Sequence, residues 1–456
     1  MITHYTYTPE GMSIFGSRER FNRVLYGGHQ NDEHQERYFT FAGDAPIFMG
    51  AASDYSQDTW CYQAKNGVLM SGLALTEGHV GEGSHDIFSS WFHECSDVLT
   101  TWRSGYLTYR LSRFSSYFPH VMVNIAVYPL ILADGFLVQY DITTDQRVIF
   151  CAGFGGITKF FGRFDHPTAK RRDFSPADCV DNQAELLSDH VAISGPNDVR
   201  MLLKADFPCE YSLTTAEALA ASSPGPFLGQ HSGPAVVARV KAIIPAHSRF
   251  RGNLLVLRNS SLEQLRSLLD SGDLASVSRN MIREKHAMIS FHTPDAQLDA
   301  TVPDTVIALD ASFHGRSFYH GAIGYHAPFL GWRGWYAPVL LGWSERVRSA
   351  IESHFDTITR SEGQERVWWD GADRPDLDHE GTQYHHLQNS SGRLTALLHR
   401  DDIYNMQEVA VDMTLFYLQN SADLETGRKI YDRLLEILAW ETRILSPDND
   451  GLYQNF

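Results

Sequence analysis

Short apolar runs separated by turn residues fill the first half of the chain. Residues 121–132, 236–244 and 254–257 are rich in the β-branched and aromatic side chains that favour strands. A succession of short strands with turns between them is typical of antiparallel sheets that pack face to face. The pattern therefore predicts an N-terminal antiparallel β-sandwich.

Two turn signals predict which of these strands pair as hairpins. Residues 135–142 and 147–151 flank the polar turn Thr143-Thr144-Asp145. Asn66-Gly67 lies between two apolar segments and predicts a second hairpin, because both residues tolerate the positive φ of a tight turn. Residues 89–102 are predicted to differ from their surroundings and to form a helical insert.

The spacing of apolar residues becomes helical after about residue 260. Thr293-Pro294-Asp295 supplies an N-cap, a proline at the first helical position and an acid in the first turn. These signals predict a helix that runs towards Phe313. Further helices are predicted over residues 336–355, 405–418 and 424–444.

This change in pattern predicts two domains. We expect a β-sandwich domain over residues 1–260, a linker over residues 261–292 and a helical toroid or bundle over residues 293–456. The length of 456 residues agrees with this division, because it exceeds what one hydrophobic core usually fills.

The composition excludes several classes of partner. Hydrophobic residues make up 43% and charged residues 20% of the chain, as in an ordinary globular protein. The net charge of −17 argues against nucleic acid, because phosphate binding needs a basic surface. No apolar run approaches the ~18 residues of a membrane-spanning helix, so no membrane partner is predicted.

The N-terminal residues lack the basic and apolar regions of a secretory signal. Two alternatives stay open: a cytoplasmic protein, or a periplasmic or secreted one whose signal has been removed.

The cysteines and histidines predict neither a metal site nor a cofactor. The count of five cysteines is odd and no C-x-x-C pair occurs, so buried reduced thiols are expected. The cluster of His379, Glu380, His385 and His386 lacks the H-E-x-x-H spacing of a zinc helix.

Several short segments, spread over nearly the whole chain, resemble a known family. The densest are Tyr319-His320-Gly321-Ala322, residues 328–333 and residues 341–346. The others are residues 22–27, 42–46, 153–156, 177–182, 293–295, 404–406, 439–441 and 448–453. In their order and spacing they resemble an uncharacterised bacterial family related to the six-hairpin (α/α-toroid) glycosidases.

The resemblance implies a β-sandwich followed by an (α/α)6 toroid that acts on glycosides. The chain has fewer long helices than the six pairs of a full toroid, so the toroid is expected to be incomplete. The resemblance implies a glycoside hydrolase with an oligo- or polysaccharide substrate. A polysaccharide lyase acting on a uronate-containing glycan is the second hypothesis, and a non-catalytic glycan-binding protein or inactive fragment is the third.

Two residues are candidates for the chemistry. Glycoside hydrolysis uses a pair of carboxyl groups, and the acid of the pair needs a raised pKa. Glu441 continues an apolar helix face after Trp440, which suits such an acid. Tyr404 is the candidate proton donor or base of an elimination. A helix-end ion pair of Glu441 with Arg443 and a core position for Tyr404 are the competing interpretations.

The candidate substrate-binding residues gather in two segments. The aromatic and cationic residues between the first two predicted toroid helices are His320, Trp332, Arg333, Trp335, Tyr336 and Trp343. Arginine grips a carboxylate or hydroxyl through its planar fork, and tryptophan offers a wall on which a sugar ring stacks. Asn405 and Gln407 begin a helix and add polar groups. An aromatic core and simple helix capping are the competing interpretations.

Overall fold

The computed structural model divides the chain into two compact units. The first comprises Met1–Gln30, Arg37–Ser53 and Tyr62–Ala311, and the second comprises Asn31–Glu36, Asp54–Cys61 and Ser312–Phe456. The residues that the structure describes are 5–8, 11–16, 23–27, 36–54, 62–75, 88–113, 115–130, 133–163, 173–260, 267, 272–290, 292–314, 317–318, 334–362, 368–369, 372–373, 382–386 and 405–445. The predicted domain limits at residues 260 and 292 stay a prediction.

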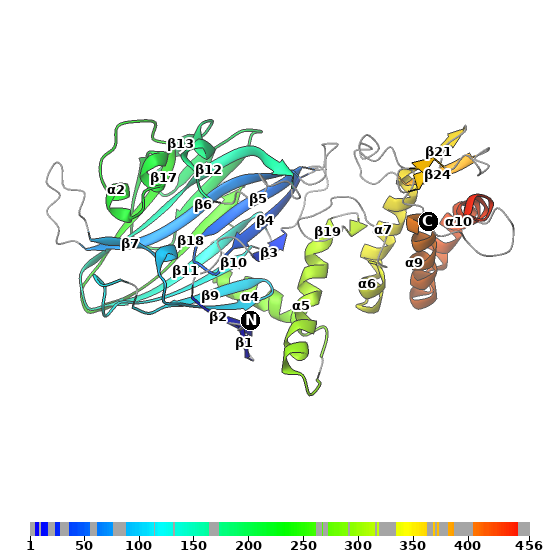
Figure 1. Ribbon diagram of the computed structural model, residues 1–456, viewed down its shortest axis with the longest axis horizontal. Coiled ribbons are helices and arrows are strands. Elements are labelled where there is room, and N and C mark those ends of the chain that lie inside the picture. Colours follow the sequence, from blue (N-terminus) through cyan, green and yellow to red (C-terminus); the bar gives the residue numbers. More distant parts are fainter. Residues whose placement is uncertain are drawn as a thin grey trace. The chain divides into compact units, whose positions relative to one another are not determined.

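The described part of the first unit contains two large antiparallel sheets (Figure 1). The ten-stranded sheet has the order β1 (Tyr5–Thr8), β2 (Gly11–Phe15), β8 (Val98–Arg103), β9 (Tyr106–Leu111), β10 (Met122–Pro129), β11 (Gly135–Thr144), β18 (Ser248–Arg258), β15 (Arg200–Ala205), β14 (Val191–Ser194) and β13 (Gln183–Leu186). The eight-stranded sheet has the order β16 (Glu210–Thr214), β17 (Val237–Ile244), β12 (Val148–Arg163), β6 (Tyr62–Leu75), β5 (Phe48–Asp54), β4 (Glu36–Ala42) and β3 (Arg23–Gly27), with β7 (Ser89–Trp91) paired to β6.

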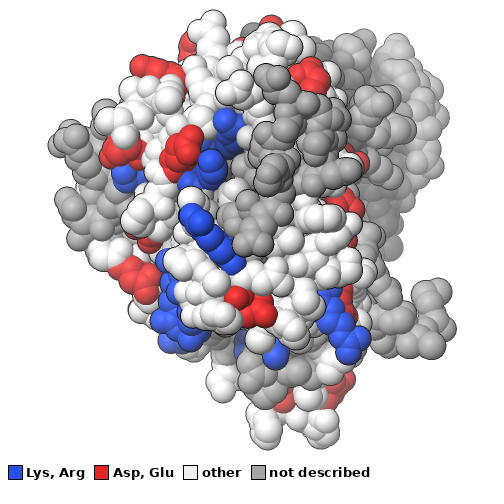
Figure 2. Space-filling model, turned by 90° about the vertical axis from the view of Figure 1, so that its left-hand side faces the viewer, with Lys and Arg blue, Asp and Glu red and all other residues white. Residues whose placement is uncertain are grey.

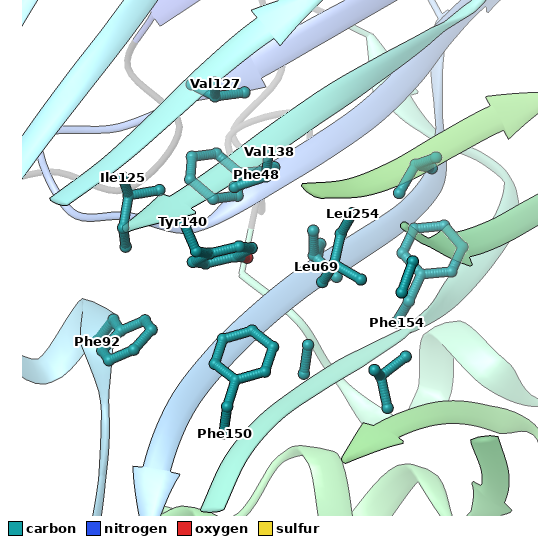
Figure 3. Close-up of a cluster of buried hydrophobic side chains, with 14 of the residues drawn as sticks. Phe48, Leu69, Phe92, Ile125, Val127, Val138, Tyr140, Phe150, Phe154 and Leu254 are labelled. Atoms are coloured by element: carbon teal, nitrogen blue, oxygen red, sulfur yellow. The ribbon is translucent and has the colours of Figure 1, made fainter. Parts of the chain in front are cut away.

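One hydrophobic core joins the two sheets. Its buried side chains come from both of them, and the labelled side chains in Figure 3 point toward one another between the strands. Tyr140 of β11 meets Phe150 of β12 edge to face, with ring centroids 4.9 Å apart. The Tyr140 hydroxyl also lies 3.1 Å from the Ser71 hydroxyl of β6. Each sheet therefore buries the apolar face of the other.

The predicted strands at residues 121–132, 236–244 and 254–257 are confirmed as β10, β17 and part of β18. The predicted hairpin across Thr143-Thr144-Asp145 is wrong, because β11 pairs with β10 and β18 whereas β12 pairs with β6 and β17. The Thr144 hydroxyl donates a hydrogen bond of 2.9 Å to the Gln146 carbonyl and accepts one of 3.1 Å from the Gln146 backbone N–H. This local turn carries the chain from one sheet to the other.

The predicted hairpin at Asn66-Gly67 is also wrong, because both residues lie inside the long strand β6. Gly67 has a φ of +94°, and the pairing of β5 with β6 shifts register between Met49 and Ala51. Gly67 therefore adopts the positive φ of a β-bulge and not that of a hairpin turn. The predicted helix at residues 89–102 is wrong as well: this segment contains β7, the short 3-10 turn Phe92–Glu94 and most of β8.

Helices accompany the sheets of the first unit. The described ones are α1 (Ala216–Leu219), α2 (Pro224–Leu228), α4 (Leu274–His286) and α5 (Ala296–Ser312), with a 3-10 turn at Pro176–Cys179. The helix predicted after Thr293-Pro294-Asp295 is confirmed as α5. The sequence did not predict α4, whose N-cap Asp273 accepts a bond from the Ser276 backbone.

The described part of the second unit is mainly helical. Its helices are α6 (Tyr336–Leu340), α7 (Ser344–Thr357), α9 (Asn405–Ser421) and α10 (Leu424–Leu445). Its short paired strands are β19 (Phe313–His314), β20 (Ser317–Phe318), β21 (Ile358–Glu362), β22 (Trp368–Trp369), β23 (Ala372–Asp373) and β24 (Thr382–His386). The helices predicted over residues 405–418 and 424–444 are confirmed. The single helix predicted over 336–355 is two helices, because Gly342 adopts a φ of +76° between them.

Large antiparallel sheets and several helices thus agree with the predicted fold class, while the β-sandwich and the (α/α)6 toroid stay predictions. Cys95, Cys151 and Cys179 are free and buried, Cys209 is free and partly exposed, and Cys61 lies outside the described residues. On the face drawn in Figure 2, basic and acidic side chains are scattered among uncharged ones. No helix in the described ranges is both long and apolar enough to cross a bilayer.

Gly67 offers a test of the bulge in the core. A Cβ at this position would lie 2.1 Å from Cζ of Phe154, whereas a Cβ at Gly16, which has a similar φ of +85°, meets nothing within 4 Å. Gly16→Ala is expected to cost roughly 1–2 kcal/mol of unfolding free energy through backbone strain. Gly67→Ala adds the displacement of the Phe154 ring, about 1–3 kcal/mol more. Urea unfolding of the two variants measures the difference, and equal stabilities would refute the close approach of Phe154.

Candidate functional site

The structure describes only part of the predicted site. Trp335, Tyr336 and Trp343 are described and lie in the second unit. Asn405 and Gln407 belong to α9, and Glu441 belongs to α10, but their side chains are not described. The residues that lie outside the described part of the chain are His320, Trp332, Arg333 and Tyr404.

Tyr336 is paired with a carboxylate that the sequence analysis missed. The Tyr336 hydroxyl, on the first residue of α6, donates a hydrogen bond of 2.6 Å to Oδ2 of Asp412 on α9. Its ring stacks on Phe416, one turn further along α9, with centroids 4.0 Å apart and planes 16° apart. A short bond from a hydroxyl to a carboxylate is among the stronger hydrogen bonds in proteins, so the pair fixes the direction of both side chains.

A signal for Asp412 was present in the sequence. It is the one acid in the run Val409-Ala410-Val411-Asp412-Met413 of α9. Its neighbours Val411 and Met413 are 6% and 0% exposed. Asp412 itself is half-buried, and a carboxylate that loses part of its hydration gains from a polar partner. Tyr336 supplies that partner.

Trp335 lies in the core of the helical unit. Its side chain is 1% exposed, and its backbone N–H donates to the Met413 sulfur at 3.3 Å. Trp335 therefore lies where its segment contacts α9. Contact of Trp335 with a sugar stays a prediction.

Trp343 forms part of a layered contact with a cation. The guanidinium carbon of Arg346 lies 4.8 Å from the centre of the Trp343 ring and 4.9 Å from the centre of the Phe313 ring. Such cation–π contacts hold an arginine while its N–H groups stay available for other bonds. Here they tie the start of α7 to β19.

The helices α9 and α10 form a hairpin joined by Ala422 and Asp423. Helices joined by so short a connection run antiparallel. The start of α9, with Asn405, and the end of α10, with Glu441, therefore share one end of the hairpin. Topology thus brings together two of the predicted site positions.

Asp423 is the N-cap of α10 and has a structural role. Its carboxylate accepts bonds from the Tyr417 hydroxyl at 2.7 Å, from the Thr426 backbone at 3.0 Å and from the Thr426 hydroxyl at 2.7 Å. These donors favour the ionised form and lower the pKa of Asp423 to about 2. Burial, together with the adjacent carboxylate, raises the pKa of Tyr417 to about 12.

The solved structures that resemble this chain have low sequence identity to it and TM-scores below 0.5. No family model and no curated protein matches the sequence. A protein from the human microbiome described as a kojibiose phosphorylase is 8% identical with a TM-score of 0.46, and the match covers 78% of this chain and 49% of that one. The chain therefore spans about half the length of that protein.

Two further solved structures are similar to this chain. A bacterial glucoamylase complexed with acarbose is 8% identical with a TM-score of 0.46 over 94% of this chain and 68% of that one. A polysaccharide lyase is 10% identical with a TM-score of 0.22 over 55% of this chain and 33% of that one. Since each score is below 0.5, these likenesses assign neither a family nor an activity to the chain.

The cap at Asp423 predicts a pH-dependent contribution to stability. Asp423→Ala is expected to lower the unfolding free energy of the helical unit by about 1 kcal/mol at neutral pH. The pKa of the Asp423 carboxyl is about 2 in the folded state, below its usual 3.8. The ionised carboxylate therefore stabilises the folded state at pH values above 3.8, and this stabilisation is lost as the pH falls towards 2.

Urea unfolding followed by far-ultraviolet circular dichroism at neutral pH and at pH ~3 measures this change. The matched control is Asp432→Ala, an exposed acid on the same helix. The cap assignment fails if the deficit of Asp423→Ala is the same at both pH values or no larger than that of the control.

Proposed function

We propose that the chain is a carbohydrate-active enzyme and that it hydrolyses a glycosidic bond of an oligo- or polysaccharide at its helical unit. The observation that carries this proposal is the 2.6 Å hydrogen bond from Tyr336 to Asp412. The bond joins α6 to α9, the helix that also holds Asn405, and α9 forms a hairpin with α10, which holds Glu441. The resemblance to six-hairpin glycosidases implies a glycoside site at these helices. A β-sandwich followed by the opening helices of an (α/α)6 toroid is the architecture that we propose with it.

Hydrolysis of a glycoside divides its work between two carboxyl groups. In this proposal Asp412 is the base or nucleophile, because the Tyr336 hydroxyl donates to its carboxylate and orients it toward one geometry. Glu441 is the proton donor, since it ends an apolar helix face in the sequence and an apolar environment favours the protonated form.

Binding of the sugar rings falls to the aromatic and polar residues around this pair. We propose that Tyr336, stacked on Phe416, forms one aromatic wall of the site. The further residues proposed to contact substrate are His320, Trp332, Arg333, Trp335, Trp343, Asn405 and Gln407. Tyrosine and tryptophan rings present a flat apolar face together with a polar edge, which matches the two kinds of surface of a sugar ring.

A polysaccharide lyase is the second candidate. An elimination needs neutralisation of a uronate carboxylate and a base such as Tyr404. The observation that favours a uronate-containing glycan is a cavity of the first unit that is lined by Arg103, Arg279 and Arg283.

The proposal predicts the effect of three substitutions on turnover of a panel of neutral and uronate-containing oligosaccharides by the full chain. Asp412→Asn and Glu441→Gln are each expected to lower kcat by ~100-fold or more, the usual effect of losing an acid or base. Tyr336→Phe keeps the ring and removes the hydroxyl, so a smaller loss is expected. Asp432→Asn, an exposed acid on α10, serves as the control.

The readout separates the candidate functions. New reducing ends without ultraviolet absorbance indicate hydrolysis, whereas the absorbance of an unsaturated uronate indicates elimination. Unchanged turnover in Asp412→Asn would remove Asp412 from the mechanism. Glycan binding without any turnover by the wild-type chain would favour the non-catalytic alternative.

A further inference from the structure

A cavity of about 500 Å³ lies in the first unit, beneath α4 and beside the turn between β8 and β9. Its lining residues are Arg103, Tyr106, Arg279, Ile282, Arg283, His286, Ala287 and Pro303. All of them belong to one compact unit, so the cavity is independent of the placement of the helical unit. Its size suits one or two sugar rings or a small anion.

The lining of this cavity is basic in a chain that is acidic. Three arginines and a histidine line it, and no aspartate or glutamate is among the lining residues. The whole chain has a net charge of −17. Clustered cations in a concave, partly dry site concentrate a positive potential that overrides the global field nearby.

The cations of α4 lie on one stripe of the helix. Arg279, Arg283 and His286 follow one another at spacings of four and three residues, which places them on the same face. Ile282 on this face is 1% exposed and anchors the helix. The side chain of Arg283 is exposed, and within the described part of the chain no ion pair of it is found.

The hairpin turn fixes the opposite wall. Arg103 pairs with Tyr106 across the two-residue turn Ser104-Gly105, so both residues flank the turn. Gly105 has a φ of +101°, and a Cβ there would lie 3.0 Å from Ile282. The turn therefore packs directly on α4 and holds Arg103 and Tyr106 close to the helix.

Asp304 of α5 connects these two walls. It lies 2.9 Å from Nε2 of His286 and accepts a bond of 3.2 Å from the Ser104 backbone N–H. One carboxylate thus holds α4 and the hairpin turn together from outside the lining. The helix and the turn that carry the cationic groups are therefore connected through α5 before any ligand arrives.

Aromatic rings lie next to the cations. The rings of Tyr106 and Tyr128 are 5.5 Å apart, and the guanidinium carbon of Arg279 lies 6.0 Å from the centre of the Tyr128 ring. A flat ring beside arginines offers an apolar face for a sugar and a charge partner for its substituent.

A second cavity of the first unit lacks this basic lining. It measures about 340 Å³, and its charged lining residues are Lys204, Asp206 and Asp273. Lys204 already pairs with Asp189 at 2.7 Å. This cavity has more acidic than basic groups, although it also contacts the start of α4.

We propose that the arginine-lined cavity binds the carboxylate of an acidic sugar residue, with Arg283 as its charge partner and Tyr106 against the ring. The choice of a sugar as the carrier of the carboxylate rests on the proposed function, whereas the anionic class of the ligand rests on the lining alone. Arginine forks match a carboxylate in two parallel bonds, which an ammonium group does not reproduce.

Calorimetric titration of the full chain with tetragalacturonate, at low ionic strength, tests this site. Arg283→Gln is expected to weaken binding by about tenfold, the usual loss for one charged hydrogen-bonded contact. Arg283→Lys keeps the charge and loses the fork, so a weakening of roughly threefold is expected. The matched control Arg110→Gln, an exposed arginine on β9 outside the cavity, is expected to leave the affinity unchanged.

Two comparisons keep this proposal apart from the proposed function. The Asp412→Asn chain is expected to bind tetragalacturonate as the wild type does, so binding at the cavity persists even where turnover is absent. Maltotetraose, which is neutral, is expected to show no dependence on Arg283. Equal affinities of wild type and Arg283→Gln overturn the site, and inorganic phosphate that binds as tightly as tetragalacturonate overturns its assignment to a sugar.

Discussion

The mutual burial of two antiparallel sheets is the constraint on which the first unit depends. Tyr140 illustrates the requirement, since it is fully buried between them and yet carries a hydroxyl. Burial raises the pKa of Tyr140 well above its usual range, because a phenolate would lose its solvation there. The neutral hydroxyl meets Ser71 at 3.1 Å, so the core gains a large ring without the cost of an unsatisfied polar group.

The ten-stranded sheet also supports one wall of the arginine-lined cavity. Strands β8 and β9 belong to the ten-stranded sheet, and their connecting turn is pressed against Ile282 of α4. Arg103 and Tyr106 are therefore positioned by strands of a sheet that its own hydrophobic core stabilises. Binding groups are located more reliably on regular elements than on long loops, because packing restricts the rotamers of their supports. The helix α4 adds the remaining cations through its own periodicity.

The sequence predicted elements well where periodicity is local and poorly where pairing is remote. The helices α5, α9 and α10 follow from capping residues and apolar spacing within a few turns of chain. The hairpin at Asn66-Gly67 failed because the same positive φ of Gly67 that suits a turn also suits a bulge, and only the partner strand β5 decides between them. The local sequence marks Asp412 as an acid among apolar residues, but its pairing with Tyr336 is remote and could not be predicted.

Two tyrosine–aspartate pairs in the helical unit show how position separates a structural from a chemical role. Asp423 stands at a helix start, where the Thr426 backbone N–H and hydroxyl complete the cap of α10 and the Tyr417 hydroxyl of α9 bonds the same carboxylate. Asp412 stands inside α9, where backbone N–H groups are already bonded and a capping role is impossible. Asp412 is half-buried at this position, and a hydrogen-bonding partner offsets the hydration that its carboxylate loses. The compensation by Tyr336 comes from another helix, so the pair specifies how α6 and α9 meet while it keeps an oriented carboxylate next to an aromatic face.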